Sequence, residues 1–266
     1  IKIQCALANH CFINEYIYSL TSSEEEDLKC LQKNVKQTFA KNGQPASLHL
    51  LVLAAYRPLF EYDWLHNLVI TEDIVEVHNR QVSEPETEMN LKKDLPILSD
   101  VDDTTSSKVQ QMYETYPYPR WVNLGVRNTP ATVSKIIDEV GLKINYPKIA
   151  KVENPKILIA GCGTGQHPIG TASRFKDSEI LAIDLSRSSL AYAKRKTDEL
   201  GIENIEYMQA DILALHKLRR RFDIIESSGV LHHMKEPVQG WKILTKLLRP
   251  AGLMKIGLYS KLARQH

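Results

Sequence analysis

The stretch Ile157-Leu158-Ile159-Ala160-Gly161-Cys162-Gly163-Thr164-Gly165 decides the fold, because an apolar run leads directly into three glycines at alternate positions. The run predicts a buried strand, and the segment that follows is able to begin a helix. Glycine permits the unusual φ values of a tight turn and lets a ligand approach the backbone. The helix N-terminus adds unpaired N–H groups and the positive end of a dipole. By itself the stretch is consistent with a polar-ligand site or with a tight turn that binds nothing.

The composition is that of an ordinary globular protein of 266 residues, long enough for two modest domains or one large one. The net charge of +2 gives no reason to expect a nucleic-acid partner or a charged membrane surface. No apolar run approaches the length of a membrane span. We therefore expect a cytoplasmic protein that binds neither nucleic acid nor membrane.

The cysteines show no metal-ligand spacing, and in a chain of this size they do not form a disulfide framework. They are Cys5, Cys11, Cys30 and Cys162. We expect reduced thiols and no bound metal. The chain starts at Ile1 without a methionine and nothing there resembles a signal peptide, so we expect a piece of a longer protein.

From Pro155 onward, strand and helix patterns alternate at the spacing of βαβ units, which predicts an α/β domain with a parallel sheet and right-handed crossovers. The expected strands are Lys156–Ala160, Glu179–Ile183, Ile205–Met208, Phe222–Glu226 and Leu253–Tyr259. The expected helices are one that ends near Arg174 with Pro168 in its first turn, Leu190–Leu200 and Val238–Leu248.

The N-terminal third carries helical patterns and no cluster of residues that suggests chemistry. Helices are expected over Ile3–Leu20, from a Ser22–Glu25 capping box through Phe39, over Ser47–Tyr56 and over Tyr62–Asn79. The polar composition of residues 81–107 predicts a linker or surface loop. We expect a small all-helical domain and its linker at residues 1–105, available to a protein partner, followed by the α/β domain at residues 106–266.

The segment Val109–Arg120, VQQMYETYPYPR, starts on one helical face and is turned into an extended course by its prolines. It is either a hydrophobic strap that packs the helical domain onto the next one or a lid over a ligand pocket. The residues that a lid would present are Tyr113, Tyr116, Tyr118 and Arg120. A short helix is expected next, from Thr132 to Val140.

Two carboxylates follow at strand ends, where parallel α/β sheets bind their ligands. Asp184 lies nineteen residues after Gly165 and is placed to accept hydrogen bonds from both hydroxyls of a ribose. Asp211, at the end of the third strand, is placed to accept one from the exocyclic amine of a purine. Either aspartate alone is more often a helix cap. Together with the glycine turn they indicate one adenosine-type ligand.

Five motifs in order resemble those of class I S-adenosylmethionine-dependent methyltransferases. They are GCGTG, the strand-end aspartate of AIDLS, MQADI, FDIIESSGVLHHM and LLRPAGLMKIGLYS. With MYETYPYPRW, the pattern most resembles bacterial methyltransferases that are often attached to tetratricopeptide repeats. The resemblance covers about residues 109–266 and implies a Rossmann-like sheet.

The resemblance implies S-adenosylmethionine as cofactor and assigns roles to the turn and the strand ends. Gly161, Gly163 and Gly165 would line its methionine end, Asp184 would hold the ribose, and Asp211 with Ile212 would frame the adenine. Ser227, Ser228 and Gly229 would lie beside the sulfonium and the methyl acceptor. The neighbouring residues Cys162, Gln166 and Leu185 complete the expected set of cofactor-binding positions.

Two departures from the family pattern accompany the resemblance. Ile159 occupies a position where such enzymes usually carry an acid that helps to hold the cofactor's amino group, so either Gln166 or backbone carbonyls must serve or the affinity for the cofactor falls. The family sheet also has two more strands after the fifth, whereas this chain stops at His266. We therefore expect a C-terminally incomplete sheet whose fifth strand is an exposed edge.

Methyl transfer from a sulfonium is an in-line displacement that depends on alignment more than on covalent catalysis. His232 and His233 are the candidate bases, with a structural role as the alternative. The strand-four end has no cysteine and no Asn/Asp-Pro-Pro-aromatic tetrad, which argues against methylation of nucleic-acid bases. The acceptor is expected to be a small molecule or a protein side chain. The competing hypotheses are a methyltransferase-like scaffold that has lost catalysis and an NAD-dependent dehydrogenase, whose G-x-G-x-x-G spacing is not met.

Overall fold

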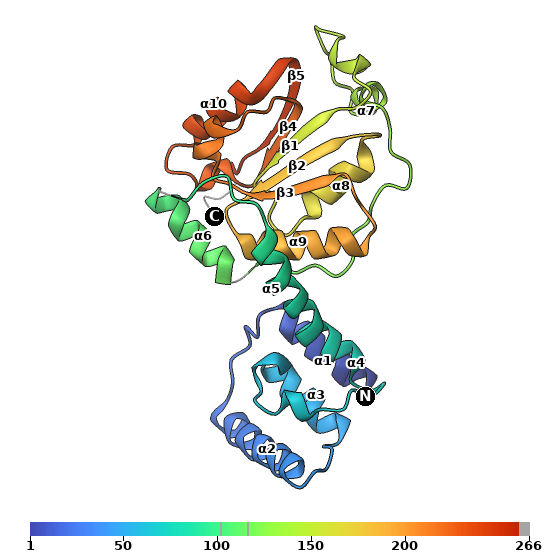
Figure 1. Cartoon of the computed structure of the whole chain (residues 1–266), viewed down its shortest axis with the longest axis vertical. Coiled ribbons are helices and arrows are strands. Elements are labelled where there is room, and N and C mark those ends of the chain that lie inside the picture. Colours follow the sequence, from blue (N-terminus) through green and yellow to red (C-terminus); the bar gives the residue numbers. More distant parts are fainter. Residues whose placement is uncertain (102, 116, 261–266) are drawn as a thin grey trace. The chain divides into compact units, whose positions relative to one another are not determined.

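The computed structural model describes residues 1–101, 103–115 and 117–260, and the chain divides into two compact units, Ile1–Glu88 and Met89–His266 (Figure 1). Helices make up the region before the first strand, and a parallel α/β sheet follows it. This is the predicted fold class. None of the helices in the described ranges is both long and apolar enough to cross a membrane.

The first unit is helical and has its own hydrophobic core. Its elements are α1 (Lys2–Ile13), α2 (Ser22–Ala40), α3 (Ser47–Tyr56), η1 (Leu59–Glu61), η2 (Leu65–Asn67), α4 (Val75–His78), η3 (Asn79–Ser83) and the start of α5 (Glu84–Asp94). Gln81 is fully buried and joins three of these elements, since its amide donates to the carbonyls of Ala8 and Ala54 and accepts from Leu59 N–H. A buried amide of this kind is tolerated because it is hydrogen-bonded.

Four sequence predictions for the helical region were wrong in detail. The first helix ends at Ile13, and the capping box is formed by Thr21 and Glu24, one residue earlier than expected. The residues expected to form one helix over Tyr62–Asn79 form short helical turns instead. The stretch predicted as a linker contains α5, whose end lies in the second unit. The prediction for α3 was confirmed.

The second unit alternates helices with five described strands. Its helices are α6 (Thr104–Thr115), α7 (Val133–Glu139), η4 (Ile149–Lys151), α8 (Gln166–Arg174), α9 (Arg187–Glu199), η5 (Ile212–Lys217), η6 (Leu231–His233) and α10 (Pro237–Leu247). Its strands are β1 (Lys156–Ala160), β2 (Glu179–Asp184), β3 (Ile205–Gln209), β4 (Phe222–Ser228) and β5 (Leu248–Gly257). Prolines begin two helices without cost, at Pro168 in the first turn of α8 and Pro237 at the start of α10.

The strands are parallel and are ordered β3-β2-β1-β4-β5. Strands β2 and β3 are added on one side of β1, and strands β4 and β5 on the other, so the topological switch point lies between β1 and β4. The carboxyl ends of these two strands therefore border the crevice in which such sheets bind ligands. β5 starts five residues earlier than predicted, because Leu248 pairs with Phe222 before a bulge restores pairing at Leu253. This irregular start cannot be read from hydrophobicity, since it includes Pro250.

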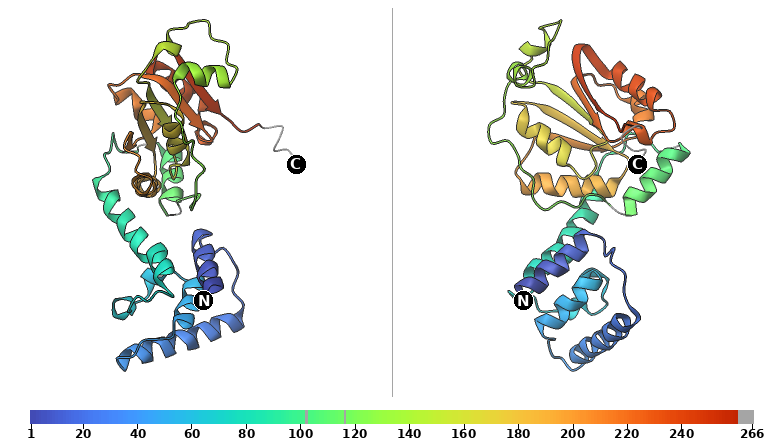
Figure 2. Two further views of the ribbon diagram at one scale, coloured as in Figure 1. Left: turned by 90° about the vertical axis from the view of Figure 1, so that its right-hand side faces the viewer. Right: turned by 180° about the vertical axis from the view of Figure 1, so that it is seen from behind.

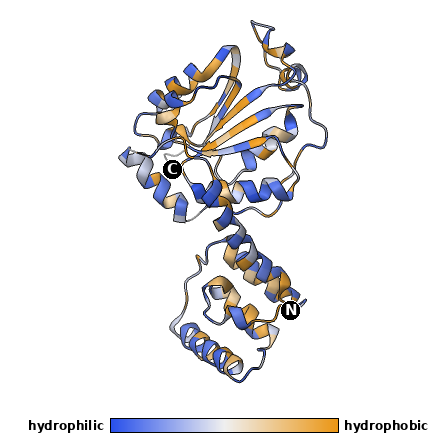
Figure 3. Ribbon diagram, viewed as in Figure 1, coloured by the Kyte–Doolittle hydropathy of each residue, from blue (hydrophilic) through white to orange (hydrophobic). Residues whose placement is uncertain are grey.

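Both faces of the sheet are covered by helices, as Figure 2 shows from two sides. Ile157 and Ile159 pack in the cluster that includes residues of α8 and α9, whereas Leu158 and Ala160 pack in the cluster that includes residues of α10. The central strands are accordingly mostly hydrophobic in Figure 3. A strand that is buried on both faces needs a continuous apolar run, which is why β1 was predicted with its observed bounds.

Candidate functional site

A cavity of about 490 Å³ lies at the carboxyl ends of β1, β2 and β4, a size typical of small-molecule sites. Most of the residues predicted from the sequence to bind a cofactor line it. They are Gly161, Cys162, Gly163, Gln166, Asp184, Leu185, Asp211, Ile212 and Ser228. Gly165 and Ser227 do not line it. The topology thus brings together residues that are separated by up to 67 positions in the sequence.

The glycine turn is tight at one position and open at another. Gly161 has φ +79°, and a Cβ there would lie 2.2 Å from Cγ2 of Val230, so that no larger residue fits without a shift. Gly163 also has positive φ, but a Cβ on it would meet nothing within 4 Å. The space beside Gly163 is therefore open to the cavity, which allows a ligand to approach the backbone there.

Asp184, at the end of β2, organises the turn from the neighbouring strand. One carboxylate oxygen accepts from Gly163 N–H at 2.8 Å, and the other accepts from Ser186 N–H at 3.0 Å. Burial raises the pKa of Asp184, while these backbone donors oppose that increase. Each carboxylate oxygen can accept a second hydrogen bond, so Asp184 can hold the turn and still accept from the hydroxyls of a ribose.

Asp211 follows β3 and is almost fully buried. Its Oδ1 accepts from Leu213 N–H at 2.8 Å, which caps the short helix η5. It lines the cavity together with Ile212, whose side chain supplies an apolar surface. The polar and apolar groups that an adenine ring requires are therefore adjacent at this strand end.

The Tyr-Pro segment forms one wall of the cavity. Tyr113, Tyr118 and Pro119 line it, whereas Arg120 lies over the ring of Tyr192, and Tyr116 is outside the described residues. The segment is fastened to the glycine turn at two points: Thr164 Oγ1 donates to the carbonyl of Pro119, and Trp121 Nε1 donates to the carbonyl of Thr164. Of the predicted lid residues, Tyr113 and Tyr118 are those that the structure places at the site.

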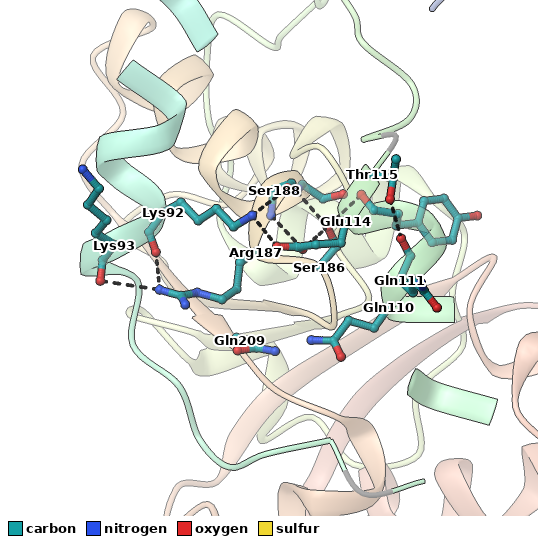
Figure 4. A network of polar contacts seen from close by, with 12 residues as sticks. Lys92, Lys93, Gln110, Gln111, Glu114, Thr115, Ser186, Arg187, Ser188 and Gln209 are labelled. Carbon is teal, nitrogen blue, oxygen red and sulfur yellow. Dashed lines mark hydrogen bonds and ion pairs between the residues drawn. The ribbon is translucent and has the colours of Figure 1, made fainter. Parts of the chain in front are cut away.

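Helix α6, which carries Tyr113, is fixed to the end of β2 by Glu114 (Figure 4). The Glu114 carboxylate forms an ion pair with Lys92 and accepts from Ser186 Oγ and Ser188 N–H at the start of α9. Burial alone would raise the pKa of Glu114, but Lys92 and the Ser188 N–H outweigh it and the pKa is lowered. A carboxylate at a helix N-terminus also complements the helix dipole.

At the end of β4, the two serines have different surroundings. Ser228 lines the cavity, while the hydroxyl of Ser227 is buried and donates to the carbonyl of Ala160, which fastens β4 to β1. His233 lines the cavity. His232 lies beside His233, and 3.1 Å separates the Nε2 atoms of the two histidines. The ring of His232 packs against the ring of Tyr259. Of the two candidate bases, His233 is the one at the cavity.

Sequence reasoning missed a buried polar pair beside the cavity. His167, in the first turn of α8, lines the cavity, and its Nε2 lies 2.7 Å from the carboxylate of Glu226 in β4. Glu226 is only 3% exposed. The signal was present in the sequence, because an acid inside the apolar strand pattern FDIIE has to find a partner when the strand is buried.

The residues present fit an adenosine-type cofactor with a methionine end. The open space at Gly163 admits a ligand to the turn, and the carboxylates of Asp184 and Asp211 provide acceptors at two successive strand ends. Across the described residues, no group of three or more His, Cys, Asp or Glu is placed to hold a metal ion. The four thiols are free, and burial raises the pKa of Cys162 in the turn, which keeps that thiol protonated.

Comparison with known proteins agrees with this geometry. Residues 157–252 match the protein family described as "Methyltransferase domain". An uncharacterized protein of Synechococcus is 29% identical over 61% of this chain and 39% of its own length. An uncharacterized protein of Rickettsia prowazekii is 32% identical over 53% of this chain and 54% of its own length. A malonyl-[acyl-carrier protein] O-methyltransferase of Paenibacillus is 32% identical over 38% of each chain.

The chain spans about half or less of the length of the relatives given above. The matched segment runs from Ile157 of β1 through the first half of β5, and it includes the glycine turn and the strand ends that border the cavity. Residues 157–252 belong to the S-adenosylmethionine-dependent methyltransferase family, and the chain contains a class I methyltransferase domain.

Proposed function

We propose that this protein transfers a methyl group from S-adenosylmethionine to a small molecule or a protein side chain by in-line displacement. The observation that carries the proposal is that Gly163, Asp184 and Asp211, which follow three different strands, line the same cavity. These positions provide backbone access, an acceptor for the ribose and an acceptor for the adenine amine. The cofactor, when bound, supplies an electrophilic methyl group on a sulfonium.

The residues of this chain are proposed to bind and align rather than to form a covalent intermediate. In this proposal Asp184 and Asp211 hold the adenosine end of the cofactor, and Ser228 and His233, which also line the cavity, face the methyl acceptor. We propose His233 as the residue that removes a proton where the acceptor requires it, since His232 does not line the cavity. Alignment of this kind accounts for a large part of the rate gain in reactions between two bound groups.

We further propose that helical residues 1–105 select the acceptor or bind a partner protein. Exposed apolar side chains on α1, at Ile3 and Leu7, support this role. In the double variant Ile3→Asp/Leu7→Asp, we expect acceptor methylation to fall while affinity for S-adenosylhomocysteine is unchanged. Unchanged methylation by that variant would assign acceptor selection elsewhere.

The binding test compares two ligands by isothermal titration calorimetry. S-adenosylhomocysteine is expected to bind, and NAD is expected not to bind, because the turn lacks the dinucleotide spacing. Binding of NAD alone would support a dehydrogenase, and binding of neither would exclude the enzyme. If S-adenosylhomocysteine binds, incubation with methyl-labelled S-adenosylmethionine and a metabolite extract or protein fraction should yield a labelled product. Binding without any labelled product would favour a domain that has lost catalysis.

A further inference from the structure

The methionine end of the proposed cofactor site lacks a charged group from β1. Ile159 occupies the β1 position at which similar methyltransferases usually carry an acid. Its side chain is fully buried in the hydrophobic cluster that contains residues of α8. The sheet register places Glu226 of β4 directly beside Ile159. Because register partners in parallel strands point to the same face, Glu226 places an acid beside Ile159 on the α8 face.

Glu226 is held by three groups of α8. Its Oε2 accepts from Thr171 Oγ1 at 2.8 Å and lies 2.7 Å from His167 Nε2, and Arg174 Nη1 lies 3.6 Å from Oε1. Burial alone would raise its pKa, but these hydrogen bonds and charges lower it to about 2. Glu226 is therefore an ionised group that sits behind His167 and does not line the cavity.

His167 is the member of this group that reaches the cavity. A neutral imidazole has one N–H donor and one acceptor nitrogen. In a neutral imidazole whose Nε2 donates to the Glu226 carboxylate, Nδ1 is the acceptor nitrogen, and this is the form that the proposal below requires.

We propose that His167, oriented by Glu226, takes over from the missing β1 acid and binds the α-ammonium group of S-adenosylmethionine through Nδ1. This assignment rests on the proposed function and names the residues that recognise the amino-acid end of the cofactor. His167 would contact the cofactor, and Glu226 would be a positioning residue that fixes the tautomer and the ring. Second partners of this kind commonly set histidine orientation in binding sites.

The test measures the affinities of three ligands by calorimetry. They are S-adenosylhomocysteine, its deaminated analogue, and 5′-methylthioadenosine, which lacks the amino-acid end. The wild-type protein is expected to prefer S-adenosylhomocysteine over the deaminated analogue by roughly 10- to 100-fold, the range of a charge-assisted hydrogen bond. His167→Ala should abolish this preference and leave the affinity for 5′-methylthioadenosine unchanged. Glu226→Gln should reduce the preference in part.

The matched control is His216→Ala, an exposed histidine of η5, which should keep the wild-type preference. An unaltered preference in His167→Ala would overturn the assignment, and so would an equal loss of affinity for all three ligands, which would indicate a structural role. If His167→Ala fails to fold, an unaltered preference in Glu226→Gln overturns the assignment. Failure of the wild-type protein to bind any of the three would overturn the proposed function itself.

Discussion

Thr164 Oγ1 donates a 2.7 Å hydrogen bond to the carbonyl oxygen of Pro119, which joins the glycine turn to the Tyr-Pro segment 45 residues earlier in the chain. Thr164 is 2% exposed, so water cannot easily replace this bond. The wall of the cavity formed by Tyr118 and Pro119 is therefore attached to the turn that it faces.

Thr164→Val removes this hydrogen bond while preserving side-chain volume. We expect a loss of about 1 kcal/mol in the free energy of unfolding and weaker S-adenosylhomocysteine binding, because the wall loosens. Urea unfolding and calorimetry measure the two effects. Thr115→Val is the control, since its hydroxyl donates to the carbonyl of Gln111 within an exposed turn of α6. Equal stability and affinity in Thr164→Val and the wild type would show that the attachment is unimportant.

Asp184→Ala is expected to weaken S-adenosylhomocysteine binding by roughly 100-fold, because the two hydrogen bonds proposed between Asp184 and the ribose would be lost. The variant should also lose about 2 kcal/mol of stability, because Gly163 N–H and Ser186 N–H lose their acceptor. Asp138→Ala, on an exposed face of α7, controls for removal of a carboxylate. Calorimetry at a temperature well below the midpoint of thermal unfolding separates the two effects. Unchanged affinity would mean that the cofactor lies elsewhere.

Gly161→Ala should destabilise the protein by about 1–3 kcal/mol, because the new Cβ overlaps Val230 and φ is +79°. In a Val230→Ala background the overlap is relieved and only the backbone strain remains, so the loss should be smaller. Gly125→Ala meets nothing within 4 Å and should leave the unfolding midpoint unchanged. A Gly161→Ala protein as stable as the wild type would contradict the observed turn.

The stability of the protein should depend on pH through Glu226. Its pKa is about 2 in the folded protein against an ordinary value of 4.5, so the unfolded chain binds more protons between these values. The contribution of Glu226, roughly 3 kcal/mol, is complete above the unfolded pKa and is lost as the pH falls toward 2. Denaturant titrations across this range should show a smaller decrease for Glu226→Gln than for the wild type. The exposed residue Glu203 gives the matched control, Glu203→Gln. If the free energy of unfolding depended on pH equally in Glu226→Gln and in the wild type, the lowered pKa of Glu226 would be refuted.

Strands β1, β2 and β4 were predictable because they are buried on both faces and therefore appear as continuous apolar runs that lead into Gly, Asp or Ser. Asp184 and Asp211 were recognised by the same reasoning, since parallel strands place their carboxyl ends at one edge. The helical unit was less predictable. Thr21 and Ser22 are both good caps, so composition alone could not choose between them.

The sequence indicated that Glu226 needs a polar partner but could not identify His167, because that contact depends on how α8 packs against β4. Only the alignment of Ile159 with Glu226 shows that an acid is present where β1 has none. Ser227 illustrates the opposite case, since adjacent residues in a strand point to opposite faces. Ser228 lines the cavity, whereas Ser227 bonds to Ala160.

His167 and Glu226 are separated by 59 residues, and β2, α9 and β3 lie between them in the chain. A partly folded chain that has assembled only β1, β2 and β3 would already hold the glycine turn and Asp184, but His167 would lack its partner. On the proposed assignment, full cofactor affinity arises only when β4 has inserted beside β1. Because a ligand stabilises the state that it binds, the cofactor would favour completion of the sheet and disfavour chains that stop short of it.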